Sequence, residues 1–232
     1  MKKSTITDWI GRICGPLLNF IVRGLALSKI APNHLTFIGL CINSGAAVAF
    51  GYGQFLWGAV IIFMAGIFDM TDGRVARVTN TVSSFGGFFD SVVDRYSDLA
   101  LYFGLLVYYA RVNRFFYVVL TALAMTGSVM VSYVRARAES QIEQCKVGFM
   151  ERPERIVLII LGALFNRWGV MAPVLWVLAL LSTITVIHRI KYTYAMTKHL
   201  GPVRETLPLA MKKGEKLSPQ PADLSTAQTT RT

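Results

Sequence analysis

The sequence predicts an all-α integral membrane protein with six transmembrane helices, preceded by an N-terminal amphipathic helix in the membrane interface. Of its 232 residues, 53% are hydrophobic and only 16% are charged, too few charges to cover a soluble domain. The stretches 34–53, 115–134 and 168–187 contain no charged residue, and about 20 apolar residues suffice to cross a bilayer as a helix. Lys and Arg gather at the ends of such stretches, as membrane topology requires.

The first element, residues 1–28, is expected to lie in the interface. Apolar residues such as Ile6, Trp9 and Ile13 recur with a helical period, and Lys2 and Arg12 lie among them. A continuous apolar core with a small-residue cleavage site does not follow the first lysines, which argues against a signal peptide.

Six spans are then expected, in a domain covering residues 29–200: 34–53, 55–78, 84–109, 114–138, 153–170 and 172–197. The links at 51–53, 111–114 and 166–167 carry three positive charges between them, and most of the others lie in the remaining links and termini. Both termini are therefore expected on the cytoplasmic side of the plasma membrane. Residues 201–232 are polar and rich in Pro, Ser and Thr, which predicts a disordered tail.

Charge and cysteine content exclude several classes of protein. The net charge is +11, but the cations do not form a basic stripe interleaved with exposed aromatic residues, so nucleic acid is not an expected partner. Cys14, Cys41 and Cys145 have neither CxxC spacing nor a nearby His, so neither a disulfide framework nor a zinc site is expected.

Four aspartates in the second and third predicted spans are the main chemical signal. Asp69 and Asp72 lie three residues apart, and Asp90 and Asp94 four apart, so each pair shares a helix face. Four unpaired carboxylates in a membrane would cost on the order of 10 kcal/mol, so a cation must offset them. Oxygen-only ligands select Mg²⁺ or Mn²⁺, and two such ions about 4 Å apart could hold a diphosphate.

A structural alternative is that these acids pair with Arg74, Arg77 and Arg95. We disfavour it, because adjacent residues such as Asp94 and Arg95 point to different faces of a helix. Asp98, one turn beyond Asp94, is expected to support the ligands from a second layer.

The run Asp69-Met70-Thr71-Asp72-Gly73-Arg74-Val75-Ala76-Arg77, followed by Gly86, Asp90 and Asp94 at fixed spacing, resembles the signature of the CDP-alcohol phosphatidyltransferase family. The resemblance implies a homodimer that uses CDP-diacylglycerol and a small polar alcohol. It also implies that Asp69, Asp72, Asp90 and Asp94 bind two divalent ions and that Asp94 is the base. The residues that it places at the CDP-lipid are Pro32, Asn33, Thr36, Gly73, Ala76, Arg77 and Gly86.

A group of cations is expected at the cytoplasmic mouth of the spans. Arg135 lies at the end of the fourth span, Arg152 and Arg155 open the fifth, and Arg189 is near the end of the sixth. Guanidinium groups bind phosphate bidentately, so the cluster fits a phosphorylated acceptor. Positive-inside topology accounts for some of these charges but not for the alternation of Arg with small residues at 135–138.

The runs 90–95, 132–139 and 151–155 are similar to the phosphatidylinositol phosphate synthase branch of that family. This similarity implies myo-inositol 1-phosphate as acceptor, contacted by Ser132, Arg135, Arg152, Arg155 and Arg189. Two departures bear on the acceptor: the branch commonly has Lys where this chain has Arg135, and residues 141–150 lack a Gly-rich pattern.

Other functions stay open at this point. Glycerol 3-phosphate is the leading rival acceptor because it is also a small phosphomonoester, whereas free inositol or serine would use the arginines poorly. A divalent-cation transporter would also place acids in the membrane, but along a continuous pore. A catalytically inactive scaffold is disfavoured because all four acids are present.

Overall fold

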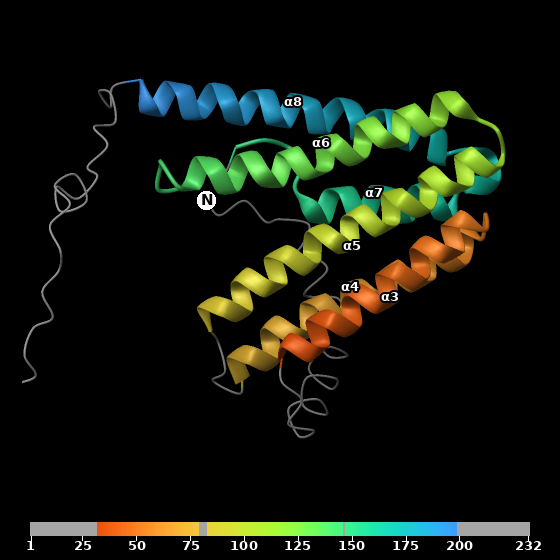
Figure 1. Cartoon of the computed structure of the whole chain (residues 1–232), viewed down its shortest axis with the longest axis horizontal. Helices are drawn as coiled ribbons and strands as arrows, with labels where there is room; N and C mark the ends of the chain where they lie inside the picture. Colours follow the sequence, from red (N-terminus) through yellow and green to blue (C-terminus); the bar gives the residue numbers. More distant parts are fainter. Residues whose placement is uncertain (1–31, 79–82, 146, 199–232) are drawn as a thin grey trace, which may run out of the picture. The chain divides into compact units, whose positions relative to one another are not determined.

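The computed structural model describes residues 32–78, 83–145 and 147–198, and within these only the backbone of residues 32, 33, 68 and 70–78. The described part contains six α-helices and one short 3₁₀ helix (Figure 1). These are α3 (Pro32–Gly51), α4 (Phe55–Val78), α5 (Ser84–Arg111), α6 (Phe115–Glu139), α7 (Arg152–Leu164), η1 (Asn166–Trp168) and α8 (Met171–Thr197). The all-α prediction is confirmed. The predicted interfacial helix and the tail lie outside the described residues.

Five helices, α3, α4, α5, α6 and α8, occupy the positions predicted for spans to within a few residues, because each is built on a long, largely apolar segment. The fifth predicted span differs from the structure. Residues 153–170 were expected to form one helix, but α7 ends at Leu164. A 3₁₀ turn follows, and Gly169 takes a left-handed conformation with φ of 73° before α8 begins. At 1.5 Å per residue, the 13 residues of α7 extend about 20 Å.

The helices form two groups joined by α5 and α7 (Figure 1). Helix α3 packs against α4 and α5, α6 packs against α8 and α5, and α7 lies against α4 and α8. The apolar interior includes Phe50, Leu101, Leu105, Ile159 and Leu175, all at most 1% exposed.

The outer surface is unusually apolar. Trp57, Phe115 and Leu180 are each more than half exposed. Hydroxyls in the apolar helices, such as those of Thr121 and Thr183, donate to the carbonyl four residues earlier, which satisfies them without water. By length and composition, three helices in the described part could cross a membrane: His34–Gly51, Phe115–Glu139 and Met171–Thr197. The protein is thus an α-helical membrane protein.

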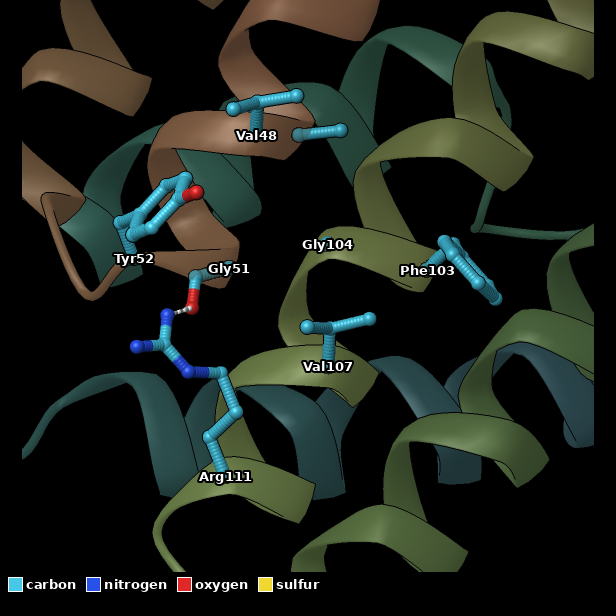
Figure 2. Close-up of a pocket in the computed structure, with 8 residues that line it drawn as sticks. Val48, Gly51, Tyr52, Phe103, Gly104, Val107 and Arg111 are labelled. Atoms are coloured by element: carbon cyan, nitrogen blue, oxygen red, sulfur yellow. Dashed lines mark hydrogen bonds between the residues drawn. The ribbon is translucent and has the colours of Figure 1, made fainter.

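The C-terminal ends of α3 and α5 are joined by Arg111, which donates to the Gly51 carbonyl at 2.8 Å and lies 5.0 Å from the centre of the Tyr52 ring (Figure 2). An apolar groove of about 490 Å³ lies beside this contact. The groove lies at one end of the interface between α3 and α5. It is distant from the acids, because Arg111 and Asp94 lie 17 residues apart on α5, about 25 Å along the helix.

Candidate active site

Helix α5 presents three aspartates on successive turns. Its start is fixed by Ser83, whose hydroxyl accepts a hydrogen bond from the Gly86 amide at 3.0 Å. Asp90, Asp94 and Asp98 then follow at intervals of four residues, which places them on one face.

Arg152 joins this face to α4. From the first position of α7, its guanidinium lies 2.8 Å from the Asp69 carboxylate, 2.9 Å from that of Asp94 and 3.4 Å from that of Asp98. Each contact uses a different guanidinium nitrogen. Burial alone would lower the pKa of Arg152, but the carboxylates of Asp94, Asp98 and Asp69 outweigh it, so the pKa is raised and the group stays charged.

A second, more deeply buried arginine anchors the cluster. Arg155 is 1% exposed and donates to Asp98 at 2.8 Å and to the Met150 carbonyl at 3.4 Å. The Asp98 carboxylate therefore contacts both arginines of α7, and its expected support of metal ligands stays a prediction. Arg95, by contrast, donates to the Ser91 carbonyl.

A cavity of about 430 Å³ opens beside these residues, between α5, α6, α7 and α8. Asp94 and Asp98 line it. So do all five residues predicted to contact the acceptor, which are Ser132, Arg135, Arg152, Arg155 and Arg189. Helices from four parts of the chain thus converge on one polar cavity.

The five differ in how accessible they are. Arg189 is 1% exposed and donates to the carbonyls of Val147 and Val131, at 2.8 and 2.7 Å, so it ties the segment before α7 to α6. Arg155 is equally buried. Arg135, 3.0 Å from Glu139 and 3.5 Å from Glu151, has a side chain that is 37% exposed.

The predicted CDP-lipid residues are described only in part. Thr36 is buried, and the Gly86 amide bonds to Ser83 as described above. The side chains of Pro32, Asn33, Ala76 and Arg77 lie outside the described residues, and Gly73 is described by its backbone alone. A methyl group at Gly39, one turn after Thr36, would lie 3.0 Å from Asp69 Oδ1, so α3 approaches the acids closely here.

The predicted metal site is also incomplete, because the side chain of Asp72 is not among those described. Within the described side chains, no three His, Cys, Asp or Glu residues gather as metal ligands. Asp69 and Asp94, from two different helices, nonetheless converge on one cation, the Arg152 guanidinium. Asp69 and Asp94 therefore fit a hard divalent ion in two respects: their ligand atoms are carboxylate oxygens, and the two side chains approach one point.

Residues 29–188 match the sequence model of the CDP-alcohol phosphatidyltransferase family. The chain belongs to this family. The prediction of the family, and with it of a phosphotransferase enzyme, is confirmed. The matched region runs from before α3 into α8 and contains the acid cluster and Arg152.

Relatives within the family share about a third of the sequence. An archaetidylinositol phosphate synthase of Methanothermobacter thermautotrophicus is 35% identical over 72% of this chain and 84% of that protein. A phosphatidylinositol phosphate synthase of Mycobacteroides abscessus is 34% identical over 78% of this chain and 84% of that protein.

Solved structures of the family have the same fold. The phosphatidylinositol phosphate synthase of Mycobacterium tuberculosis with CDP-DAG bound has a TM-score of 0.73 and 30% identity, covering 77% of this chain and 94% of that one. The same synthase in complex with manganese and citrate has a TM-score of 0.70 and covers 76% and 88% of the two chains.

The contacts of Arg152 and Arg155 with the acids were not predicted from the sequence. The two arginines follow Asp98 by 54 and 57 residues, so no local period links them. The sequence indicated only that Arg152 and Arg155 lie on either side of Pro153 at the start of a helix.

Proposed function

We propose that this enzyme transfers the phosphatidyl group of CDP-diacylglycerol to myo-inositol 1-phosphate and releases CMP. One observation carries the proposal: the cavity that holds Asp94 also holds Ser132 and the arginine cluster, so a base and a phosphate-binding surface face the same space. The names of the two relatives reported above, both inositol phosphate synthases, support the choice of acceptor.

The residues act as follows in this proposal. Arg135 and Arg152 bind the acceptor's phosphate, Ser132 helps to orient the sugar, and the buried Arg155 and Arg189 hold the cavity walls. Asp94 accepts the proton of the acceptor's hydroxyl group. The hydroxyl oxygen bonds to the phosphatidyl phosphorus, and the bond between that phosphorus and the CMP oxygen breaks. The nucleotide side is formed by Pro32, Asn33, Thr36, Gly73, Ala76, Arg77 and Gly86.

Asp69, Asp72, Asp90 and Asp94 would hold two divalent ions, Mg²⁺ or Mn²⁺. When bound, the ions supply positive charge to the diphosphate and to the departing CMP oxygen. The manganese complex of the mycobacterial synthase supports the use of a divalent ion.

We further propose six membrane crossings in a domain of residues 29–200, with an interfacial helix at 1–28 and a disordered tail at 201–232. The chain would form a homodimer in the plasma membrane, with its active site and both termini on the cytoplasmic side. The cations of the cavity favour this orientation.

The deciding experiment measures CMP release by the purified protein with Mn²⁺ or Mg²⁺ and a CDP-lipid donor. Inositol 1-phosphate, glycerol 3-phosphate and free inositol are compared as acceptors. Release with inositol 1-phosphate alone is expected. Release only with glycerol 3-phosphate would overturn the acceptor and keep the reaction class. Both ester-linked and ether-linked donors belong in the assay, because the Methanothermobacter relative is named for an archaetidyl group.

A cation transporter is the alternative from another class. The described acids Asp69, Asp94 and Asp98 meet the arginines of α7 in one cluster instead of following a pore. In sealed vesicles, Asp94→Asn is expected to abolish phosphatidyl transfer and leave Mn²⁺ flux unchanged. Flux that depends on Asp94 would support transport.

A further inference from the structure

Arg152 has two competing uses for one guanidinium group. All three of its nitrogens lie against carboxylates, with Asp69 at 2.8 Å, Asp94 at 2.9 Å and Asp98 at 3.4 Å. The same side chain lines the cavity that we assign to the acceptor. A guanidinium binds phosphate through a fork of two parallel N–H groups, and here every nitrogen is already engaged.

The carboxylates that Arg152 joins are also the ones that a divalent ion needs. Asp69 comes from α4 and Asp94 from α5, so a cation between them links the two helices. Arg152 contacts Asp69 Oδ2 and Asp94 Oδ1, so a divalent ion bound between these two carboxylates would lie within a few ångströms of the guanidinium, where like charges repel strongly. Arg152 and a divalent ion are therefore competitors for Asp69 and Asp94.

We propose that Arg152 is a built-in counter-ion that occupies the acid pair until a divalent ion displaces it, and that the displaced side chain then completes the phosphate-binding surface of the cavity. Its contact with Asp98 is the longest of the three, and Asp98 is held independently by Arg155 at 2.8 Å. The side chain can thus leave Asp69 and Asp94 while Asp98 stays in place. Binding of the metal ion is thereby coupled to binding of the acceptor, because the ion must bind first to free Arg152 for the phosphate. The second half of this inference rests on the proposed function, whereas the competition for the acids does not.

Mn²⁺ binding measured without lipid or acceptor tests the competition. Electron paramagnetic resonance counts free Mn²⁺ in a titration of detergent-purified protein. Arg152→Gln is expected to bind Mn²⁺ at least about tenfold more tightly than the unaltered protein, because each of the two contacts of Arg152 with Asp69 and Asp94 is worth about that factor or more. Arg135→Gln is the matched control. It removes the same charge from the same cavity, but its guanidinium contacts Glu139 and Glu151, so a change of about twofold or less is expected at physiological salt.

Equal tightening in the two variants would mean a general charge effect and would overturn the proposal. Weaker Mn²⁺ binding by Arg152→Gln would also overturn it, because Arg152 would then organise the metal ligands instead of competing for them.

A second measurement needs no variant and covers the case in which Arg152→Gln does not fold. Phenylglyoxal modifies accessible guanidinium groups, and mass spectrometry follows each site in the unaltered protein. Mn²⁺ is expected to speed modification of Arg152 severalfold relative to Arg135, and an equal or slower reaction would overturn the proposal. Because neither measurement uses substrates, a protein that passes both and releases no CMP with inositol 1-phosphate would refute the proposed function alone.

Discussion

Single residues in the cavity allow buried and exposed ion pairs to be compared within one protein. Asp98 and Arg155 are 6% and 1% exposed, whereas the side chains of Glu139 and Arg135 are about one-third exposed. Breaking a buried pair leaves an uncompensated charge in a low-dielectric interior, and breaking an exposed pair returns both groups to water.

Asp98→Asn is therefore expected to destabilise the protein by about 3–5 kcal/mol, because the Arg155 guanidinium would be left without its anion. Glu139→Gln, at the exposed pair 3.0 Å from Arg135, is expected to cost less than about 1 kcal/mol. Thermal unfolding in one detergent measures both. Similar losses in the two variants would contradict the assignment of Asp98 as the anchor of the α7 arginines.

Arg135 and Arg137 allow a second comparison, because they lie on the same helix two residues apart. Arg135 lines the polar cavity, whereas Arg137 lines a separate groove between α6 and α8. Loss of a charged hydrogen bond to phosphate costs about 1.5–3 kcal/mol, or roughly 10- to 100-fold. Arg135→Gln should raise the KM for inositol 1-phosphate by about that factor and leave the KM for the CDP-lipid unchanged.

Arg137→Gln removes an equal charge from the same turn and should change either KM by no more than about twofold. Steady-state kinetics with each substrate varied in turn separates the two outcomes. If both variants raise the acceptor KM equally, the cavity does not select the phosphate.

Among the helices, α3 and α5 make the closest backbone approach that the described glycines reveal. A methyl group at Gly104 would lie 2.2 Å from the Ala47 carbonyl oxygen and 2.7 Å from its Cα. Both atoms belong to backbone and cannot rotate away, so Gly104 is required for the two helices to pack.

Gly104→Ala should destabilise the protein by about 1–3 kcal/mol, the usual cost of overpacking. Gly45→Ala, on α3 where a methyl group meets no atom within 4 Å, should be neutral or slightly stabilising. Thermal unfolding of the two variants gives the comparison. A Gly104→Ala protein as stable as the original would place the helices further apart than described.

The helices themselves were predictable from the sequence, whereas the contacts between them were not. Apolar runs located α3, α4, α5, α6 and α8, and the four-residue spacing put Asp94 and Asp98 on one face. The end of α7 at Leu164 was missed because Phe165, Trp168 and Val170 are apolar on both sides of the 166–167 link, so the helix was extended through that link to residue 170. The partners of the acids were missed because Arg152 and Arg155 come from a distant helix, and sequence patterns reveal neighbours only within about one turn.

At the scale of the whole molecule, helix length and helix composition lead to different numbers of membrane crossings. Three described helices qualify by both criteria. Helices α4 and α5, with 24 and 28 residues, would extend about 36 and 42 Å and so exceed the roughly 30 Å hydrocarbon core. Helix α5 fails on composition because it carries five charged residues, Asp90, Asp94, Arg95, Asp98 and Arg111. In α4, the apolar stretch Phe55–Ile67 ends shortly before Asp69. The arginines of α7, which pair with Asp69, Asp94 and Asp98, lower the cost of placing these acids within long apolar helices.

Six crossings place the link around Asn113 and the turn around Arg167 on one side of the membrane, and Ser140 on the other. Single cysteines at these three exposed positions, in a protein with Cys14, Cys41 and Cys145 replaced by Ser, report the sides through a membrane-impermeant maleimide. Cysteines at 113 and 167 are expected to react in intact cells, and a cysteine at 140 only after permeabilisation. The position at 167 is decisive because α7, about 20 Å long, is too short to cross alone and needs the residues of η1 to complete the passage. If 167 reacts only after permeabilisation, like 140, then α7 returns to the side from which it started, and the six-crossing arrangement is wrong.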